Sequence, residues 1–510
     1  MSPSASSACS APAPTDLWMR GVAANRGAPA EVLLRLLDPA AGAARQLLCE
    51  ERTLPDEVVD AVVAHPEVKV RRSLARNAHA APAHRGRLAS DPHVMVRATV
   101  AGGPRPRPRQ QRPLPDDVLV TLLTAEDSGE PELLTVNEIL QELMFSRQVT
   151  PSFRYRMRGH EHPTVRGLAT DVWSGLTAEE QEALLNDPDP DVRASAEYWV
   201  SAADPAGMGA VFPAPGHYRW MVLNNYALSD AVLEEALADP EFRWSVAGNP
   251  YTPPHAVARL ARDADPAVRE RVAARADLDP AVWEVLAEDP HERVRTRARV
   301  QPLPRTTAQC WAVDHEMAED PRDWECLCPI LEPCTEPYTG PDPQWYRACA
   351  ESEEVVLRLA AAKCPTLPAD LVARLAEDPV EEVRHRLASW HPLAPAETVL
   401  AAFVARPRQR PHLLMQSRLP RTGLSHLLDH EDPEVRALAA ADPTLGRPPV
   451  ELLTDPDDRV RRAAAANPLL TADVLEALLH DPATAEGAAA NPGLPTARLH
   501  ALLDLADLPR

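Results

Sequence analysis

The chain has 510 residues, a formal net charge of −22 and an aromatic content of 4%. This acidic balance argues against nucleic acid as a partner, because its phosphates would be repelled by most of the surface. No run of about 18 apolar residues is present, so we expect no membrane span. We also expect a cytoplasmic location, where cysteines are more often thiols or metal ligands than disulfides.

The N-terminal segment MSPSASSACSAPAPTD is small and polar and lacks the basic start and apolar core of a secretory signal. We expect it to be disordered. The other regions are predicted from where the repeat described below is regular and where it is interrupted. In chain order they are a disordered tail over 1–15, repeats over 16–101, a Pro/Arg-rich insertion loop over 102–115, repeats over 116–304, an irregular Cys/Pro-rich insertion over 305–345, and repeats with a C-terminal cap over 346–510.

A Val-Arg pair, or a degenerate form of it, recurs at steps of mostly about 25 or 26 residues. The arginines of this series are Arg20, Arg45, Arg71, Arg97, Arg166, Arg193, Arg219, Arg243, Arg269, Arg295, Arg358, Arg384, Arg410, Arg436 and Arg461. Gly487 takes the place of the arginine in the last member. With Asn137 and Glu325 filling the two gaps, the chain has about eighteen repeats, a period typical of a solenoid.

The repeat over 453–468 reads LTDPDDRVRRAAAANP and predicts a short helix with its own start and stop signals. Asp455 is a candidate N-cap, and Pro456 suits the first helical turn, where its missing N–H is not needed. The helix should stop at Asn467, because Asn tolerates the left-handed C-cap conformation and the following Pro cannot continue the helix. Thr471 should then cap a second helix.

The second helix of each repeat carries an apolar stripe at spacing i, i+1, i+4, i+5, which is one helical face. Examples are Val58, Val59, Val62 and Val63, then Val232, Leu233, Ala236 and Leu237, and then Val474, Leu475, Leu478 and Leu479. A unit this small cannot bury such a face alone, so neighbouring repeats should stack into a continuous core. The sequence therefore predicts an all-α solenoid without strands.

The succession Asn-Pro, Leu-x-Pro or Leu-Pro, an apolar helix and Asp-Pro-x-x-x-Val-Arg resembles the leucine-rich repeat variant family. The resemblance covers nearly the whole chain and is clearest over 247–299 and 435–491. It implies repeats that pair an α-helix with a shorter α- or 3₁₀-helix in a right-handed superhelix. HEAT-like repeats share Asp-Pro-x-x-x-Val-Arg and are the competing assignment.

The recurring arginine invites two interpretations, a basic ladder for an acidic partner or a structural contact. A residue that recurs once in each repeat is more simply explained by a structural role than by binding of a partner. We expect it to pair with an Asp of its own or the neighbouring repeat, or with carbonyl groups at helix ends.

Two departures from the repeat are candidates for function. In Tyr218-Arg219-Trp220 and Phe242-Arg243-Trp244 the Val is aromatic, and the residue after the Arg, elsewhere Arg, Glu or His, is Trp. We expect Trp220 and Trp244 to lie side by side on one surface, with Tyr226 and Tyr251 near the following turns, as an interaction hot spot. The alternative is that these aromatics fill a locally wider core.

The second departure places Cys310, Cys326, Cys328 and Cys334 within a proline-rich stretch where the repeat lengthens. Four thiolates suit a structural zinc or an iron–sulfur cluster. The resemblance adds that a prototype of the leucine-rich repeat variant family carries a cysteine-ligated iron–sulfur domain, placed before its repeats. Unliganded thiols are the alternative.

No Gly-rich phosphate loop, G-x-S-x-G elbow or H-E-x-x-H helix is present, so we do not expect an enzyme. The leading hypothesis is a scaffold without a cofactor that binds a protein or peptide on its extended curved surface, with the acidic charge favouring a basic partner. One alternative is a metal- or iron–sulfur-bearing repeat protein with a redox or sensing role. Another is nucleic-acid binding through the Pro/Arg-rich loop over 105–112, as in some HEAT-like DNA-binding solenoids.

Overall fold

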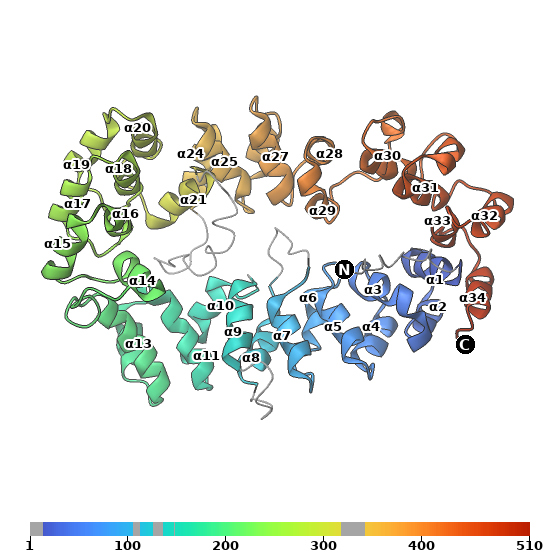
Figure 1. Ribbon diagram of the computed structural model, residues 1–510, viewed down its shortest axis with the longest axis horizontal. Coiled ribbons are helices and arrows are strands. Elements are labelled where there is room, and N and C mark those ends of the chain that lie inside the picture. Colours follow the sequence, from blue (N-terminus) through green and yellow to red (C-terminus); the bar gives the residue numbers. More distant parts are fainter. Residues whose placement is uncertain (1–13, 106–112, 126–135, 147, 318–341) are drawn as a thin grey trace, which may run out of the picture. The chain divides into compact units, whose positions relative to one another are not determined.

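Figure 1 shows the computed structural model, which describes residues 14–105, 113–125, 136–146, 148–317 and 342–510. In these ranges every regular element is an α-helix or a short 3₁₀-helix, and one isolated β-bridge joins Gly209 to Leu228. The predicted all-α class is therefore confirmed. No helix within the described ranges is long and apolar enough to cross a membrane.

The chain divides into two compact units, and the first combines both ends of the sequence. Unit 1 comprises Met1–Gln148 and Pro392–Arg510, and unit 2 comprises Val149–His391. The helices of unit 1 are α1 (Pro14–Ala24), α2 (Ala30–Arg35), η1 (Pro39–Ala41), α3 (Gly42–Glu50), α4 (Asp56–Val63), α5 (Val68–Arg76), α6 (Pro82–Gly86), α7 (Val94–Gly102), α8 (Asp116–Leu123), α9 (Val136–Phe145), α28 (Ala396–Ala405), η4 (Pro407–Gln409), α29 (Arg410–Leu413), η5 (Ser425–Leu427), α30 (Pro433–Ala440), η6 (Val450–Thr454), α31 (Asp458–Ala465), α32 (Ala472–Leu479), α33 (Ala485–Ala489) and α34 (Thr496–Leu505).

Unit 2 arranges its central helices in two rows. Its helices are α10 (Pro151–Arg156), η2 (Met157–Gly159), α11 (Pro163–Gly167), η3 (Leu168–Gly175), α12 (Ala178–Leu185), α13 (Pro190–Ala202), α14 (His217–Asn225), α15 (Asp230–Ala238), α16 (Pro240–Gly248), α17 (Pro254–Leu260), α18 (Pro266–Ala273), α19 (Pro280–Ala287), α20 (Glu292–Arg299), α21 (Thr307–Met317), α24 (Pro343–Glu351), α25 (Val355–Lys363), α26 (Ala369–Ala376) and α27 (Glu381–Trp390). α14, α16, α18 and α20 pack on one another in succession, while α15, α17 and α19 form the second row (Figure 1).

The second row buries the predicted apolar stripe. In α15 all four stripe residues, Val232, Leu233, Ala236 and Leu237, are at most 3% exposed. Leu233, Ala236 and Leu237 belong to one core cluster that also takes in buried residues of α16, α17, α18, α19 and α20. Each short helix thus buries its apolar face only by packing on its neighbours.

The first Asp of the Asp-Pro motif does not cap the following helix, contrary to the prediction for Asp455. α31 begins at Asp458, and its N-cap is Asp457, whose carboxylate accepts a hydrogen bond from the backbone N–H of Arg459. The carboxylate of Asp455 instead accepts two hydrogen bonds from Arg436 of the preceding repeat, each at 3.0 Å. Thr471 does occupy the N-cap position of α32, although its side chain makes no capping bond.

The recurring arginine is structural, as predicted. In most members of the series Nη1 donates to main-chain carbonyl oxygens five and six residues earlier, as in Arg269, which donates to Ala264 and Asp263 at 3.2 and 2.7 Å. In some members Nε and Nη2 also pair with both carboxylate oxygens of an Asp in the next repeat. The described residues contain five such bidentate pairs, Arg71–Asp91, Arg166–Asp187, Arg269–Asp289, Arg358–Asp378 and Arg436–Asp455. The guanidinium holds the pKa of Asp187, Asp289 and Asp455 below its usual range.

The Asn of the Asn-Pro motif is also a contact between repeats and not a left-handed C-cap, which corrects the predicted conformation. Asn77 and Asn249 have φ of −66° and −70°, and Asp507 is the only non-glycine residue in the described ranges with a positive φ. The Nδ2 of Asn249 donates to the carbonyl oxygens of Leu223 and Tyr226 at 3.0 and 2.8 Å. Asn is required there because its amide reaches back to the preceding repeat.

Replacing Asn467 by alanine is expected to cost about 2 kcal/mol, because two main-chain carbonyl groups lose their buried donor. Asn467 is 0% exposed, and its Nδ2 donates to the carbonyl oxygens of Ala440 and Asp442, both at 2.8 Å. Urea unfolding measures the loss. The exposed Asn186, replaced in the same way, should cost less than about 0.5 kcal/mol. Equal losses in the two variants would contradict the contact role.

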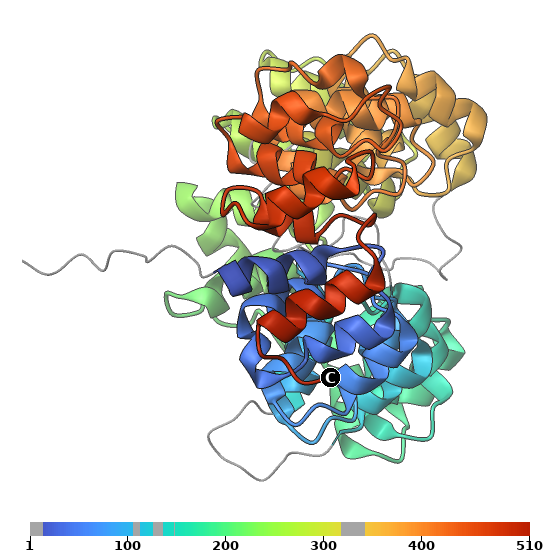
Figure 2. The same cartoon turned by 90° about the vertical axis from the view of Figure 1, so that its right-hand side faces the viewer.

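The first and last repeats pack against each other inside unit 1. α1 packs on α33, and Figure 2 shows the dark red α34 beside the blue N-terminal helices. Asn25 donates to the carbonyl oxygens of Ala489 and Asn491 at 3.0 and 2.7 Å, the same contact that Asn491 makes with the repeat before it. The first repeat therefore docks as the successor of the last.

Candidate functional site

Trp220 and Trp244 are the exposed centre of an aromatic surface on unit 2. Trp220 lies on α14 and Trp244 on the neighbouring α16, each directly after the arginine of its repeat. Their exposed fractions are 39% and 43%, so the expectation that these two side chains face solvent is confirmed. Because they occupy equivalent positions on helices that pack side by side, both indoles belong to the same face of this row.

Both indole rings are held by neighbouring side chains. The imidazole of His217 stacks on Trp220 with ring centroids 5.7 Å apart and an interplanar angle of 17°. The guanidinium carbon of Arg271, on α18, lies 4.9 Å from the ring centroid of Trp244. Burial lowers the pKa of Arg271, and the nearby Arg275 lowers it further. A ring already fixed in place loses little conformational entropy when it binds a partner.

Tyr251 and Tyr226, the other two predicted surface residues, differ in their burial. Tyr251 is 38% exposed at the turn after α16 and joins the exposed aromatics. Tyr226 is only 4% exposed and packs in a small core cluster with Ala202 and Val222, which corrects its assignment to the binding surface. Its hydroxyl group is hydrogen-bonded to that of Tyr198, and burial raises the pKa of Tyr226. Tyr226 therefore belongs to the core and not to the exposed aromatic surface.

Sequence reasoning missed two exposed aromatic residues, Tyr218 and Tyr198, with exposed fractions of 58% and 40%. Tyr218 stands at the position of the usually buried Val, yet it is the second residue of α14 and faces solvent. At the equivalent position Phe242 packs on Phe212, with ring centroids 5.3 Å apart. The sequence signal for the exposure of Tyr218 is the absence of an Asp-Pro pair before it, because that pair marks the usual start of the helix in other repeats.

Within the described ranges the exposed aromatic residues are confined to one part of the chain. Among the residues that the structure describes, every exposed aromatic side chain lies between Tyr198 and Tyr251. The same stretch contains six carboxylates against two arginines. One of these arginines, Arg243, pairs with Asp263 at 2.9 Å, and the other, Arg219, lies over the rings of Phe212 and Phe242. The aromatic surface is thus surrounded by net negative charge.

The predicted cysteine site falls largely outside the described residues, as Cys326, Cys328 and Cys334 do. Cys310 lies on α21 and is 4% exposed. Burial raises the pKa of the Cys310 thiol. Within the described ranges no group of three or more His, Cys, Asp or Glu side chains is arranged to hold a metal ion. The Pro/Arg-rich loop likewise lies outside the described residues over 106–112.

No protein-family model and no curated protein matches this chain.

Proposed function

We propose that the chain is a non-enzymatic scaffold, a solenoid of the leucine-rich repeat variant or HEAT type, that binds a basic peptide segment of a partner protein. Trp220 and Trp244 anchor the peptide, and the surrounding carboxylates attract its lysines and arginines. The observation that carries the proposal is the confinement of all exposed aromatic side chains of the described residues to 198–251.

The scaffold part of the proposal rests on contacts that recur from one repeat to the next. The bidentate Arg–Asp pairs and the Asn contacts both join a repeat to its neighbour and not to itself. Repeat arrays stabilised by nearest-neighbour contacts are used across proteins as extended binding surfaces. A solenoid of about eighteen repeats is the architecture that fits these contacts.

The basic character of the partner follows from the charge and the aromatic chemistry of the surface. A guanidinium or ammonium group over an indole ring contributes about 0.5–1 kcal/mol at exposed sites. Trp244 already contacts one cation in this way, the guanidinium of Arg271. Exposed carboxylates nearby, such as Glu241 on α16 and Glu234 on the adjacent α15, add attraction to a basic segment and speed its association.

Replacing both Trp220 and Trp244 by alanine is expected to weaken peptide binding at least about 30-fold, since hot-spot tryptophans contribute about 2 kcal/mol or more. Peptides selected on the intact protein from a random displayed library supply the ligands, and fluorescence polarisation measures their affinity. The selected peptides should be rich in Lys and Arg. Their binding should weaken as the salt concentration rises.

Val285→Ala is the matched control, because Val285 is also an exposed apolar residue of unit 2 at 38% exposure. Its peptide affinity should equal that of the unchanged protein. The double Trp variant should keep its melting temperature within a few degrees. Selection of acidic peptides would refute the basic partner, and unchanged affinity of the double variant would refute the aromatic surface as the binding site.

A further inference from the structure

Arg461 is one of several arginines of the recurring series that have no carboxylate partner among the described residues, as Arg97 and Arg295 also have none. Arg461 keeps the main-chain contacts of the series, with Nη1 donating to the carbonyl oxygens of Asp455 and Pro456 at 2.7 and 3.0 Å. Its Nε is buried without a hydrogen-bond partner. Asp481, which stands where the partner Asp recurs, is exposed and accepts a hydrogen bond from the N–H of Ala483. Among the described residues Arg461 makes no ion pair.

The repeat that follows Arg461 has a glycine, Gly487, in place of its arginine. A Cβ on Gly487 would lie 2.3 Å from the carbonyl oxygen of Arg462 and 2.9 Å from the Cβ of Ala465. α33 therefore packs unusually close to α31, and no arginine side chain fills the space beside it. That space is part of a pocket of about 350 Å³, which we name the Arg461 pocket.

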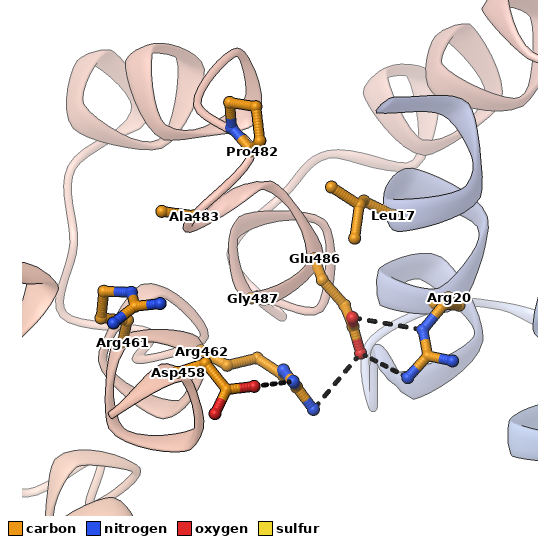
Figure 3. Close-up of a pocket in the computed structure, with 9 residues that line it drawn as sticks. All are labelled: Leu17, Arg20, Asp458, Arg461, Arg462, Pro482, Ala483, Glu486 and Gly487. Atoms are coloured by element: carbon orange, nitrogen blue, oxygen red, sulfur yellow. Dashed lines mark hydrogen bonds and ion pairs between the residues drawn. The ribbon is translucent and has the colours of Figure 1, made fainter. Parts of the chain in front are cut away.

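The Arg461 pocket joins an apolar wall to a positive edge (Figure 3). Leu17 of α1 faces Pro482 and Ala483 across it. A chain of ion pairs runs below them, from Asp458 to Arg462 at 2.9 Å, from Arg462 to Glu486 at 3.6 Å, and from Glu486 to Arg20 at 3.2 Å. The two carboxylates are engaged by these arginines, so the third arginine, Arg461, leaves the pocket with a net positive charge.

We propose that the Arg461 pocket binds a small monocarboxylate with a short apolar body. The ligand's carboxylate takes the Nε and Nη2 edge of Arg461, the edge that an aspartate occupies in the five bidentate pairs of the other repeats. A small shift of the side chain exposes the buried Nε–H to the ligand. The apolar body packs against Leu17, Pro482 and Ala483. The volume is at the lower end of the range for small-molecule sites.

Binding at this site also stabilises the packing of the first repeat on the last. The pocket takes Leu17 and Arg20 from α1 and its other lining residues from α31, α33 and the turn before α33. A ligand that needs both walls binds only when α1 is docked. At a ligand concentration 100 times its Kd, opening of α1 should become about 100-fold rarer.

The test uses the full chain with sodium hexanoate as the probe and hexanamide as its uncharged counterpart. Titration calorimetry should show saturable one-to-one binding of hexanoate and none of hexanamide. Hydrogen exchange of the α1 amides should slow on addition of hexanoate. Arg461→Gln should weaken binding at least about tenfold, the value of a hydrogen-bonded charge.

Two further variants keep the test decisive if Arg461→Gln fails to fold. Ala483→Phe fills the pocket from an exposed position and leaves Arg461 in place, so it should also weaken hexanoate binding at least about tenfold. Arg459→Gln removes an exposed arginine of the same helix that does not line the pocket, and it should bind normally. The proposal is overturned if hexanoate does not saturate, if hexanamide binds equally well, or if Ala483→Phe binds like the unchanged protein.

Discussion

Replacing Gly21 by alanine is expected to destabilise the docking of the N-terminal helix on the C-terminal repeats by about 3 kcal/mol. A Cβ at this position would lie 2.3 Å from the carbonyl oxygen of Glu486 and 2.5 Å from the Cβ of Ala489. The first of these atoms belongs to the backbone of α33, which cannot move aside as a flexible side chain does. The helices must therefore separate, and the contacts that Asn25 makes across them are lost.

Hydrogen exchange of α1, α33 and α34 measures this loss, and all three helices should exchange faster together in the variant. Gly446→Ala is the control within unit 1, because a Cβ on Gly446 would meet no atom within 4 Å. It should leave exchange of these helices unchanged. If Gly21→Ala protects α1 as well as the unchanged protein does, the first repeat is not packed on the last.

Asp289→Asn is expected to lower the free energy of unfolding of unit 2 by about 3 kcal/mol at pH 7, because a mostly buried charge loses its partner. Both oxygens of Asp289 accept from Arg269, at 2.7 and 3.0 Å, and the two side chains are 4% and 12% exposed. Urea unfolding, followed by hydrogen exchange of α18 and α20, measures the effect. Glu288→Gln is the neighbouring control, since that exposed carboxylate should contribute less than about 1 kcal/mol.

The effect of Asp289→Asn should depend on pH in a defined direction. The hydrogen bonds from Arg269 and from the N–H of His291 hold the pKa of Asp289 below its usual range. The charged carboxylate therefore contributes its full stability above the unfolded-state pKa of about 4 and loses it as the pH falls through the lower folded-state pKa. The difference between the two proteins should be constant from pH 7 to 5 and shrink below pH 4. A difference that grows in acid would contradict the ion pair.

The structural role of the recurring arginine was predictable, but the role of its companion aspartate was not. An Asp two residues before the N-cap of a helix and an Asp at the N-cap look alike in sequence, and both accept main-chain N–H groups. Asp455 and Asp457 take different tasks because Arg436 of the preceding repeat lies beside the first of them only. The role of Asn249 was not predictable either, because its amide donates to carbonyl oxygens 23 and 26 residues earlier in the sequence.

The aromatic surface was predictable only in part. The position after the arginine accepts Arg, Glu and His elsewhere in the chain, and that pattern indicated that Trp220 and Trp244 face solvent. No such pattern separates Tyr226 from Tyr251, which both follow the end of a helix. Tyr226 is buried because it packs with Val222 and with Ala202 of the preceding α13, which also supplies a hydroxyl partner in Tyr198.

The periodic apolar stripes, the start and stop residues and the spacing of Val-Arg determined by themselves that this chain is helical, because each of these signals acts within one turn or one helix. Only the tertiary structure decided which residues join one repeat to another. It also decided that Gly21 and Gly487 are sites of close helix packing and that the first repeat docks on the last. Those outcomes depend on the fit between surfaces more than 400 residues apart in sequence, and no local pattern encodes such a fit.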